Sequence, residues 1–173
     1  HTLGEIEMNA SFTGTLTLTG ALTVTTAGGA NGYFDIQGGT VTLTDQPLYV
    51  DGFLYVGAAG VFDSGTGAVT IESADAQYTA TQITAANTTW NATSSLNLQS
   101  DVDQTLPSGE AYATLQLGSY SGEVTEFTGG GAITGDLVID ADAVLYMDTD
   151  TSVSGDVIID GAIYTRGYEL TIA

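Results

Sequence analysis

The feature that most constrains this sequence is an internal repeat. Residues 133–140 read ITGDLVID and residues 153–160 read VSGDVIID, so Gly, Asp, Ile and Asp return at the same offsets with branched apolar residues between them. A fixed period of about 20 residues is typical of one coil of a parallel β-solenoid, in which each coil buries its inward side chains by stacking on its neighbours. The repeat therefore predicts stacked coils, and we expect the rest of the chain to form further, less regular coils.

Composition and local alternation indicate that the whole chain is built from β-strands. Hydrophobic residues make up 43% of the 173 residues, with 23 Gly and only 2 Pro. Residues 12–25 alternate, with Leu and Val on one side and Thr on the other, and no window places apolar residues at helical spacing. We predict a single all-β domain over residues 1–173, a parallel β-solenoid. A β-sandwich or jelly-roll subunit joined by donor-strand exchange is the alternative.

The strength of this pattern divides the chain into four parts. Residues 1–10 mix apolar and acidic residues, and we expect them either to enter the first coil or to pair with a neighbouring subunit. Short strands predict a first solenoid block over residues 11–73 and a C-terminal block over residues 111–173. Residues 74–110 lose the pattern and include the only Trp, Trp90. We interpret them as an irregular, decorated region, where repeat proteins often carry function.

The charge of the chain excludes several classes of partner. It has 21 acidic residues, a formal net charge of −20 and a single basic residue besides His1, which is Arg166. Nucleic acids and anionic membrane surfaces attract proteins through Lys and Arg. No stretch approaches the roughly 20 apolar residues of a membrane-spanning helix. We therefore expect no nucleic acid partner and no membrane span.

The residues needed for nucleophilic catalysis are missing from the chain. It has no Cys, its only His is His1, and no Gly-x-Ser-x-Gly segment occurs, so Ser-His and Cys-His catalysis are unsupported. Paired carboxylates can hydrolyse glycosides. However, β-helix enzymes that act on acidic sugars need basic groups to hold the substrate. This chain offers one Arg, and its 21 acidic residues would repel such substrates. We therefore do not expect an enzyme.

The acidic residues of the C-terminal block are the candidates for a metal site. With a period of 20, Asp136 stacks on Asp156 and Asp140 on Asp160 at about the 4.8 Å strand spacing, where two carboxylates repel by about 1 kcal/mol in water. A bound cation, a raised pKa or splayed side chains would relieve this repulsion, and alternating Asp residues are how loops present oxygen atoms to Ca²⁺. Solvated turn residues are the alternative interpretation. The predicted Ca²⁺ ligands are Asp136, Asp140, Asp142, Asp148, Asp150, Asp156 and Asp160.

Three features favour a secreted or cell-surface location. The chain begins at His1, as a protein does after removal of a signal peptide. Asn-x-Ser/Thr segments make Asn9, Asn87 and Asn91 acceptors for N-glycosylation. The absence of Cys removes oxidation-sensitive thiols, although it also rules out disulfide staples, so stability must come from packing and assembly. We therefore expect an extracellular protein with glycans as possible attachments or partners.

The repeat resembles the coils of two kinds of known protein. Residues 135–140 with residues 153–162 are similar to the coils of bactofilins, which are polymerising bacterial β-helices, and to the stalks of secreted β-helical adhesins. The resemblance covers residues 134–173 well and residues 1–60 loosely. It implies a solenoid architecture and self-assembly, while the sequons and the lack of Lys place the analogy outside the cell.

Three functions follow from these observations. The first is a structural subunit that self-assembles noncovalently into an extracellular filament, sheath or surface layer. The second is a secreted adhesin or carbohydrate-binding module that uses Tyr and Trp side chains. The third is an ice-binding solenoid, because residues 15–19 and 40–44 form Thr-x-Thr rows; such rows would have to repeat in every coil, and the C-terminal coils lack them.

Surfaces for self-assembly are expected at the ends and along one apolar row. Residues 137–139 and 157–159 are apolar on both faces, which predicts that Val138 and Ile158 lie one above the other on the outside. Residues 2–8 and 168–173 alternate like strands, with no capping segment beyond them in this sequence, so their edges are expected to pair with another copy. The predicted interface residues are Leu3, Ile6, Val138, Ile158, Leu170 and Ile172.

Overall fold

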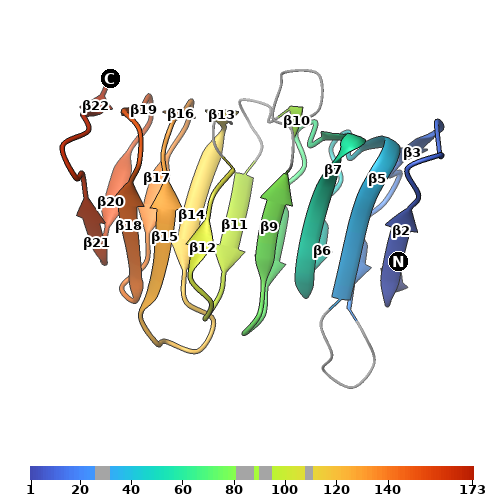
Figure 1. The fold of residues 1–173 in the computed structure, drawn as a ribbon, viewed down its shortest axis with the longest axis horizontal. Coiled ribbons are helices and arrows are strands. Elements are labelled where there is room, and N and C mark those ends of the chain that lie inside the picture. Colours follow the sequence, from blue (N-terminus) through green and yellow to red (C-terminus); the bar gives the residue numbers. More distant parts are fainter. Residues whose placement is uncertain (26–31, 81–87, 90–94, 108–110) are drawn as a thin grey trace.

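The structure is a parallel β-solenoid, as the repeat predicts. The computed structural model describes residues 1–25, 32–80, 88–89, 95–107 and 111–173, and Figure 1 shows their coils stacked side by side from the N-terminus to the C-terminus. The paired strands are parallel, and the described residues contain no helix, hence none that could span a membrane. The alternative fold, an antiparallel sandwich or jelly roll, is therefore wrong.

One side of the solenoid is a continuous sheet that takes one strand from each of eight coils. We call it sheet A. Its strands, in spatial order, are β1 (Thr2–Leu3), β4 (Leu22–Val24), β6 (Leu48–Val50), β8 (Val69–Glu72), β11 (Ser95–Gln99), β14 (Thr114–Gly118), β17 (Leu137–Ile139) and β20 (Val157–Ile159).

The other two sides are built differently in the two halves of the chain. In the N-terminal half, sheet B bends around a corner, because the long strand β5 pairs with β2 through its first part and with β3 through its second, and the long strand β7 continues along β5. Its strands are β2 (Glu5–Met8), β3 (Thr15–Thr17), β5 (Gly32–Thr42), β7 (Gly52–Asp63), β9 (Gln77–Ala80) and β10 (Thr88–Thr89).

In the C-terminal half, two separate sheets form these two sides. Sheet C contains β12 (Gln104–Thr105), β15 (Thr125–Gly129), β18 (Ala143–Met147) and β21 (Ala162–Tyr164). Sheet D contains β13 (Ala111–Tyr112), β16 (Ala132–Ile133), β19 (Thr151–Val153) and β22 (Leu170–Ile172).

The register of the strands confirms the repeat. Val153 pairs with Ile133 in sheet D, and residues 157–159 pair with residues 137–139 in sheet A. The offset between these partners is the period of the sequence repeat. Elsewhere the step is shorter, as where Ala162 pairs with Val144, or longer, as where Leu96 pairs with Val69, because the corners differ in length.

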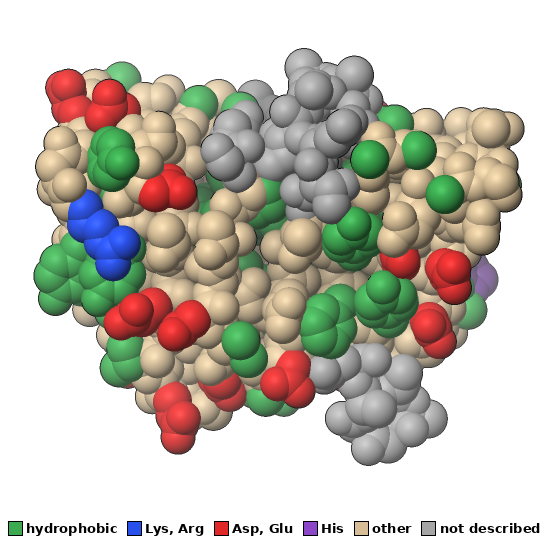
Figure 2. All heavy atoms as spheres, in the orientation of Figure 1, with side chains coloured by type: hydrophobic (Ala, Val, Ile, Leu, Met, Phe, Trp, Pro, Cys, Tyr) green, Lys and Arg blue, Asp and Glu red, His purple; other side chains and the backbone are tan. Residues whose placement is uncertain are grey.

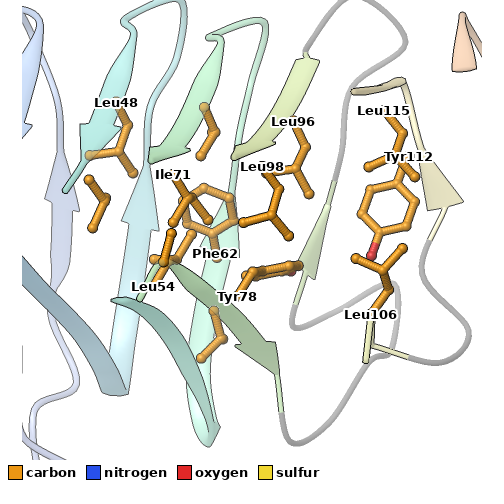
Figure 3. Close-up of a cluster of buried hydrophobic side chains, with 14 of the residues drawn as sticks. Leu48, Leu54, Phe62, Ile71, Tyr78, Leu96, Leu98, Leu106, Tyr112 and Leu115 are labelled. Atoms are coloured by element: carbon orange, nitrogen blue, oxygen red, sulfur yellow. The ribbon is translucent and has the colours of Figure 1, made fainter. Parts of the chain in front are cut away.

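The hydrophobic core is a column of inward side chains that runs through the coils. Branched and aromatic residues from all sides meet there, and Figure 3 shows Leu54, Phe62, Ile71, Tyr78 and Leu98 pointing toward one another from neighbouring coils. Each such side chain contributes about 1.5–3 kcal/mol when fully buried. Each is covered by the coil before and the coil after it, so among the described residues the inward side chains of the first and last coils are covered on one side only.

The first ten residues belong to the solenoid. β1 pairs with β4, which places Leu3 beside Val24, and β2 pairs with β5, which places Ile6 beside Phe34. Residues 1–10 therefore supply two strands of the first coil. Pairing with a neighbouring subunit, as expected from the sequence, is open only to the opposite edge of these strands.

Sheet A continues through the irregular middle region. β11 pairs with β8 on one side and β14 on the other, so described residues within 74–110 form coils. The other two sides are interrupted here, since sheet B ends at β9 and β10 while sheets C and D begin at β12 and β13. A hollow of about 440 Å³, lined by residues 77–79 and 103–107, lies at this interruption. Trp90 lies outside the described residues.

Candidate assembly surfaces

The first coil presents three strand edges without a partner in the described residues. β1, β2 and β3 each pair with the second coil only. Leu3 points inward like its register partner Val24, yet it is 47% exposed whereas Val24 is fully buried. The difference arises because no described coil lies on the outer side of Leu3.

A hollow opens inside this first coil. It has a volume of about 390 Å³ and is lined by the inward side chains of Met8 and Leu16, by Phe12 from the corner between β2 and β3, and by Glu7 and Asn9. Phe12 is 44% exposed. The apolar lining is the part of the core that another coil would fill.

The last coil has the same character at the opposite end of the molecule. β20, β21 and β22 are the final strands of sheets A, C and D. Ile159 is 45% exposed and Ile172 is 59% exposed, although their register partners Ile139 and Val153 are fully buried. The cause is the same as at Leu3, since no described coil follows these residues.

Four of the inward positions at the two ends were expected from the sequence. The predicted residues Leu3, Ile6, Leu170 and Ile172 all lie in end coils, with Ile6 and Leu170 half-buried against the core. Five other inward apolar residues of the same coils were missed, namely Met8, Leu16, Val157, Ile159 and Ile163. The alternation of inward and outward residues in β2, β3, β20 and β21 is the signal that could have identified them.

The predicted outer ladder on sheet A is present. Val138 and Ile158 are register partners on the outward face, with Val138 half-buried and Ile158 48% exposed. The preceding outward residue in this row is Gln116. The apolar row is therefore confined to the last two coils and is continuous with the open C-terminal end.

The seven predicted metal ligands are not brought together. No group of three or more acidic or His side chains in the described part of the chain is arranged to hold a metal ion. Asp136 and Asp156 do stack, and the Oδ1 atom of Asp136 accepts a hydrogen bond from the backbone N–H of Asp156 at 2.8 Å. Asp142, Asp148 and Asp160 are exposed at corners. Binding of Ca²⁺ by these residues stays a prediction.

The Asp136 contact recurs at other corners of the solenoid. The Oδ1 atoms of Asp101, Asp103 and Asp150 accept backbone N–H groups of Ser121, Glu126 and Glu169 in the next coil, at 2.8–3.0 Å. At each of these corners, a carboxylate in one coil thus accepts a hydrogen bond from a backbone N–H of the following coil. Burial alone would raise the pKa of Asp101, but the hydrogen bonds from Ser121 and Ser119 outweigh it and leave this pKa below its usual value.

Asp140 lies in a different setting, on the outward face after β17. Its carboxylate accepts hydrogen bonds from the side-chain amides of Gln99 and Gln116, each at 3.0 Å. Sequence spacing gave no sign of this network, because its members come from three coils. The two amides are therefore side-chain partners of Asp140.

The one acidic residue buried among the described residues is Asp35, in β5. Its Oδ2 atom accepts hydrogen bonds from the Tyr33 hydroxyl at 3.2 Å and from Gln37 at 3.0 Å, while its Oδ1 atom has no partner. Glu7 is its register partner in β2. Burial and then the neighbouring Asp35 carboxylate raise the pKa of Tyr33.

Exposed aromatic residues gather at the C-terminal end of sheet C. The Tyr146 and Tyr164 rings stack with centroids 5.1 Å apart, and the Arg166 guanidinium lies 4.1 Å from the Tyr146 centroid. Figure 2 shows this single basic side chain, in blue, against apolar side chains at the end where Figure 1 places β21. The Tyr146 hydroxyl donates to Glu126 at 3.2 Å. Partial burial and this hydrogen bond raise the pKa of Tyr146.

The structure also bears on two other features predicted from the sequence, the glycosylation sites and the Thr-x-Thr rows. Asn9 is exposed, and its Oδ1 atom accepts hydrogen bonds from the backbone and hydroxyl of Ser11; Asn87 and Asn91 lie outside the described residues. Thr15 and Thr17 stack on Thr40 and Thr42, but the next coil places Val61 and Asp63 at these positions. The Thr rows are therefore two coils deep on this side.

A scan against protein-family models finds no match, and comparisons with curated proteins and with solved structures also find none. Function is therefore inferred from the geometry of the described residues.

Proposed function

We propose that this protein is a structural subunit that self-assembles noncovalently into an extracellular filament, sheath or surface layer. The observation that carries the proposal is that both end coils leave three strand edges and inward apolar side chains without a partner in the described chain. A solenoid coil is stabilised when another coil stacks on it, and an open strand edge binds another strand through backbone hydrogen bonds. A second copy of the chain supplies both.

The free-energy contributions to end-to-end contact between two copies favour a reversible association. Covering a fully exposed Leu or Ile contributes about 1.5–3 kcal/mol, so the half-exposed Leu3, Ile159 and Ile172 contribute about 1 kcal/mol each. Each backbone hydrogen bond adds about 0.5–1.5 kcal/mol, whereas association costs about 4–15 kcal/mol. These opposing terms are of similar size, so we expect assembly to depend on protein concentration.

Charge opposes assembly at low salt. Each copy carries a formal net charge of −20, and the repulsion between copies acts over a Debye length of about 30 Å at 0.01 M salt but only about 8 Å at 0.15 M. Added salt should therefore promote polymer formation. An extracellular location is supported by the Asn-x-Ser/Thr segments and the absence of Cys.

Negative-stain electron microscopy with sedimentation tests the proposal. Purified protein at increasing concentration and salt should give filaments or sheets and a sedimenting fraction that dissolves on dilution. Discrete monomers at high concentration, at both physiological and high salt, would overturn the proposal.

A carbohydrate-binding module is the second candidate, and one observation favours it. Tyr164 and Tyr168 are 53% and 42% exposed near the end of sheet C, and exposed aromatic rings pack against the apolar faces of sugars, as they do against other apolar surfaces. A glycan array separates the two functions. Binding that disappears in a Tyr164→Ala variant, together with a monomer in microscopy, would favour the second.

A further inference from the structure

We propose that copies join in one defined register, in which β1, β2 and β3 of one copy lie in parallel on β20, β21 and β22 of the copy before it. This inference rests on the proposed self-assembly and names its joint. The occupant of each open end is thus a second copy of this chain, seated as the next coil of the same solenoid.

The two end coils have matching outlines. In the last coil, a corner of two residues separates β20 from β21 and a corner of five separates β21 from β22. In the first coil the corresponding corners have one residue and six. The sixth coil has the opposite order, with six residues between β14 and β15 and two between β15 and β16. The last coil thus returns to the short-then-long outline of the first.

The inward side chains match as well. The stretch of chain from Ile159 to Ile172 has the same length as the stretch from Leu3 to Leu16. Inside the molecule the corresponding stretches have other lengths: the stretch from Val50 in β6 to Phe62 in β7 is one position shorter, that between the buried inward residues of β17 and β19 is one longer, and that between those of β14 and β16 is three longer. Placing Ile159 on Leu3 therefore places Ile172 on Leu16, and β21 then lies over β2.

The shapes at the joint are also complementary. The first coil is hollow, with about 390 Å³ lined by Met8, Phe12 and Leu16 between β2 and β3. Leu170 and Ile172, on the strand that would cover β3, are inward apolar residues of the last coil; Leu170 is half-buried and Ile172 is 59% exposed. In the proposed register their side chains enter the hollow, and the apolar core continues from one copy into the next.

The distribution of charge fits this seating. Asp160 and Glu169 occupy the corners of the last coil, and they would face Gly4 and residues 9–14, which contain no acidic residue. Arg166 follows β21, and its guanidinium lies over the Tyr146 ring of the preceding coil. The acidic corners therefore avoid one another.

Cysteine cross-linking tests the register directly, because the chain has no Cys of its own. Register partners on neighbouring strands have Cα atoms about 4.8 Å apart, within the roughly 4.4–6.8 Å range of disulfides. The ends of one copy are separated by seven strand spacings, about 34 Å, so any disulfide between them joins two copies. The matched variants are Leu3→Cys with Ile159→Cys, and Leu16→Cys with Ile172→Cys. The crossed control is Leu3→Cys with Ile172→Cys.

A cooperative melting transition in dilute, low-salt solution first shows that each variant folds as a monomer. We expect all three to fold, because the substituted side chains are only half-buried. Under assembling conditions, oxidation should convert both matched variants into a ladder of oligomers at least ten-fold faster than the crossed control. Filaments with equal rates in all three variants would overturn the register while leaving the proposed function standing. Absence of filaments and of cross-links would overturn both.

Discussion

Ile139 and Ile159 allow the effect of an uncovered coil on stability and assembly to be measured at two stacked positions of the core. They are register partners that point inward from β17 and β20. Ile139 is fully buried between the strands on either side, whereas Ile159 is 45% exposed because no described strand follows it. Replacing each with Ala therefore makes the same chemical change in an enclosed and in an open position.

The expected losses of stability differ by a factor of about three. Ile→Ala in an enclosed core costs about 2–5 kcal/mol, which includes a term for the cavity left behind. Ile139→Ala should fall in this range. Ile159 has about half of its surface covered and the deletion leaves no enclosed cavity, so we expect a loss of about 1 kcal/mol from the free energy of unfolding of the monomer.

The effects on assembly should run in the opposite order. Ile159→Ala removes an apolar contact worth about 1 kcal/mol from the proposed joint, which raises the critical concentration for polymer formation about five-fold. Ile139→Ala should leave that concentration nearly unchanged. Urea unfolding in dilute, low-salt solution gives the first quantity, and sedimentation at physiological salt gives the second. Equal effects of the two substitutions in either assay would refute the reasoning.

Three other predictions concern the acidic corners and the outer row. Because the pKa of Asp101 is lowered in the folded state, the unfolded chain takes up the proton first as pH falls, so this carboxylate stabilises the fold at neutral pH and the contribution is lost below about pH 4. Asp101→Asn should cost about 1 kcal/mol at neutral pH in thermal or urea unfolding, and a difference that persists in strong acid would argue against it. If Ca²⁺ binds the predicted Asp residues, a chelator should lower the melting temperature of the parent but not of an Asp136→Asn/Asp156→Asn variant; no change in the parent would contradict the calcium prediction. Ile158→Asp, at an outward position, should reduce polymer formation at least several-fold while the monomer still folds, and an unfolded monomer would show that Ile158 belongs to the core.

The C-terminal coils could be predicted closely from the sequence. Residues 133–140 and 153–160 repeat with matched Gly and Asp residues, and alternation of inward and outward side chains then fixes the register. This is why Val138 was correctly expected above Ile158 on the outside. The same alternation, continued by one residue, places Ile159 inward in the last coil, so this position was predictable although it was not named.

The N-terminal coils and the polar contacts could be predicted less well. Strands β5 and β7 run through a corner with an irregularity after Ile36, and no repeat in the sequence marks where one side ends. The hydrogen bond from Asp156 to Asp136 depends on the path of the corner, and the Asp140 contacts join side chains that are 24 and 41 positions apart in the chain. Such contacts depend on corner lengths, which hydrophobic patterning does not specify.

The most direct test of axial self-assembly is the rise per subunit in a cryo-electron microscopy reconstruction of the polymer. If each copy continues the solenoid of the copy before it, eight coils at about 4.8 Å give a rise of about 38 Å along the filament axis, with strands perpendicular to that axis and no break in their spacing at the joint. A polymer whose axis runs across the coils, or one in which a gap separates the last strand of one copy from the first strand of the next, would contradict the account.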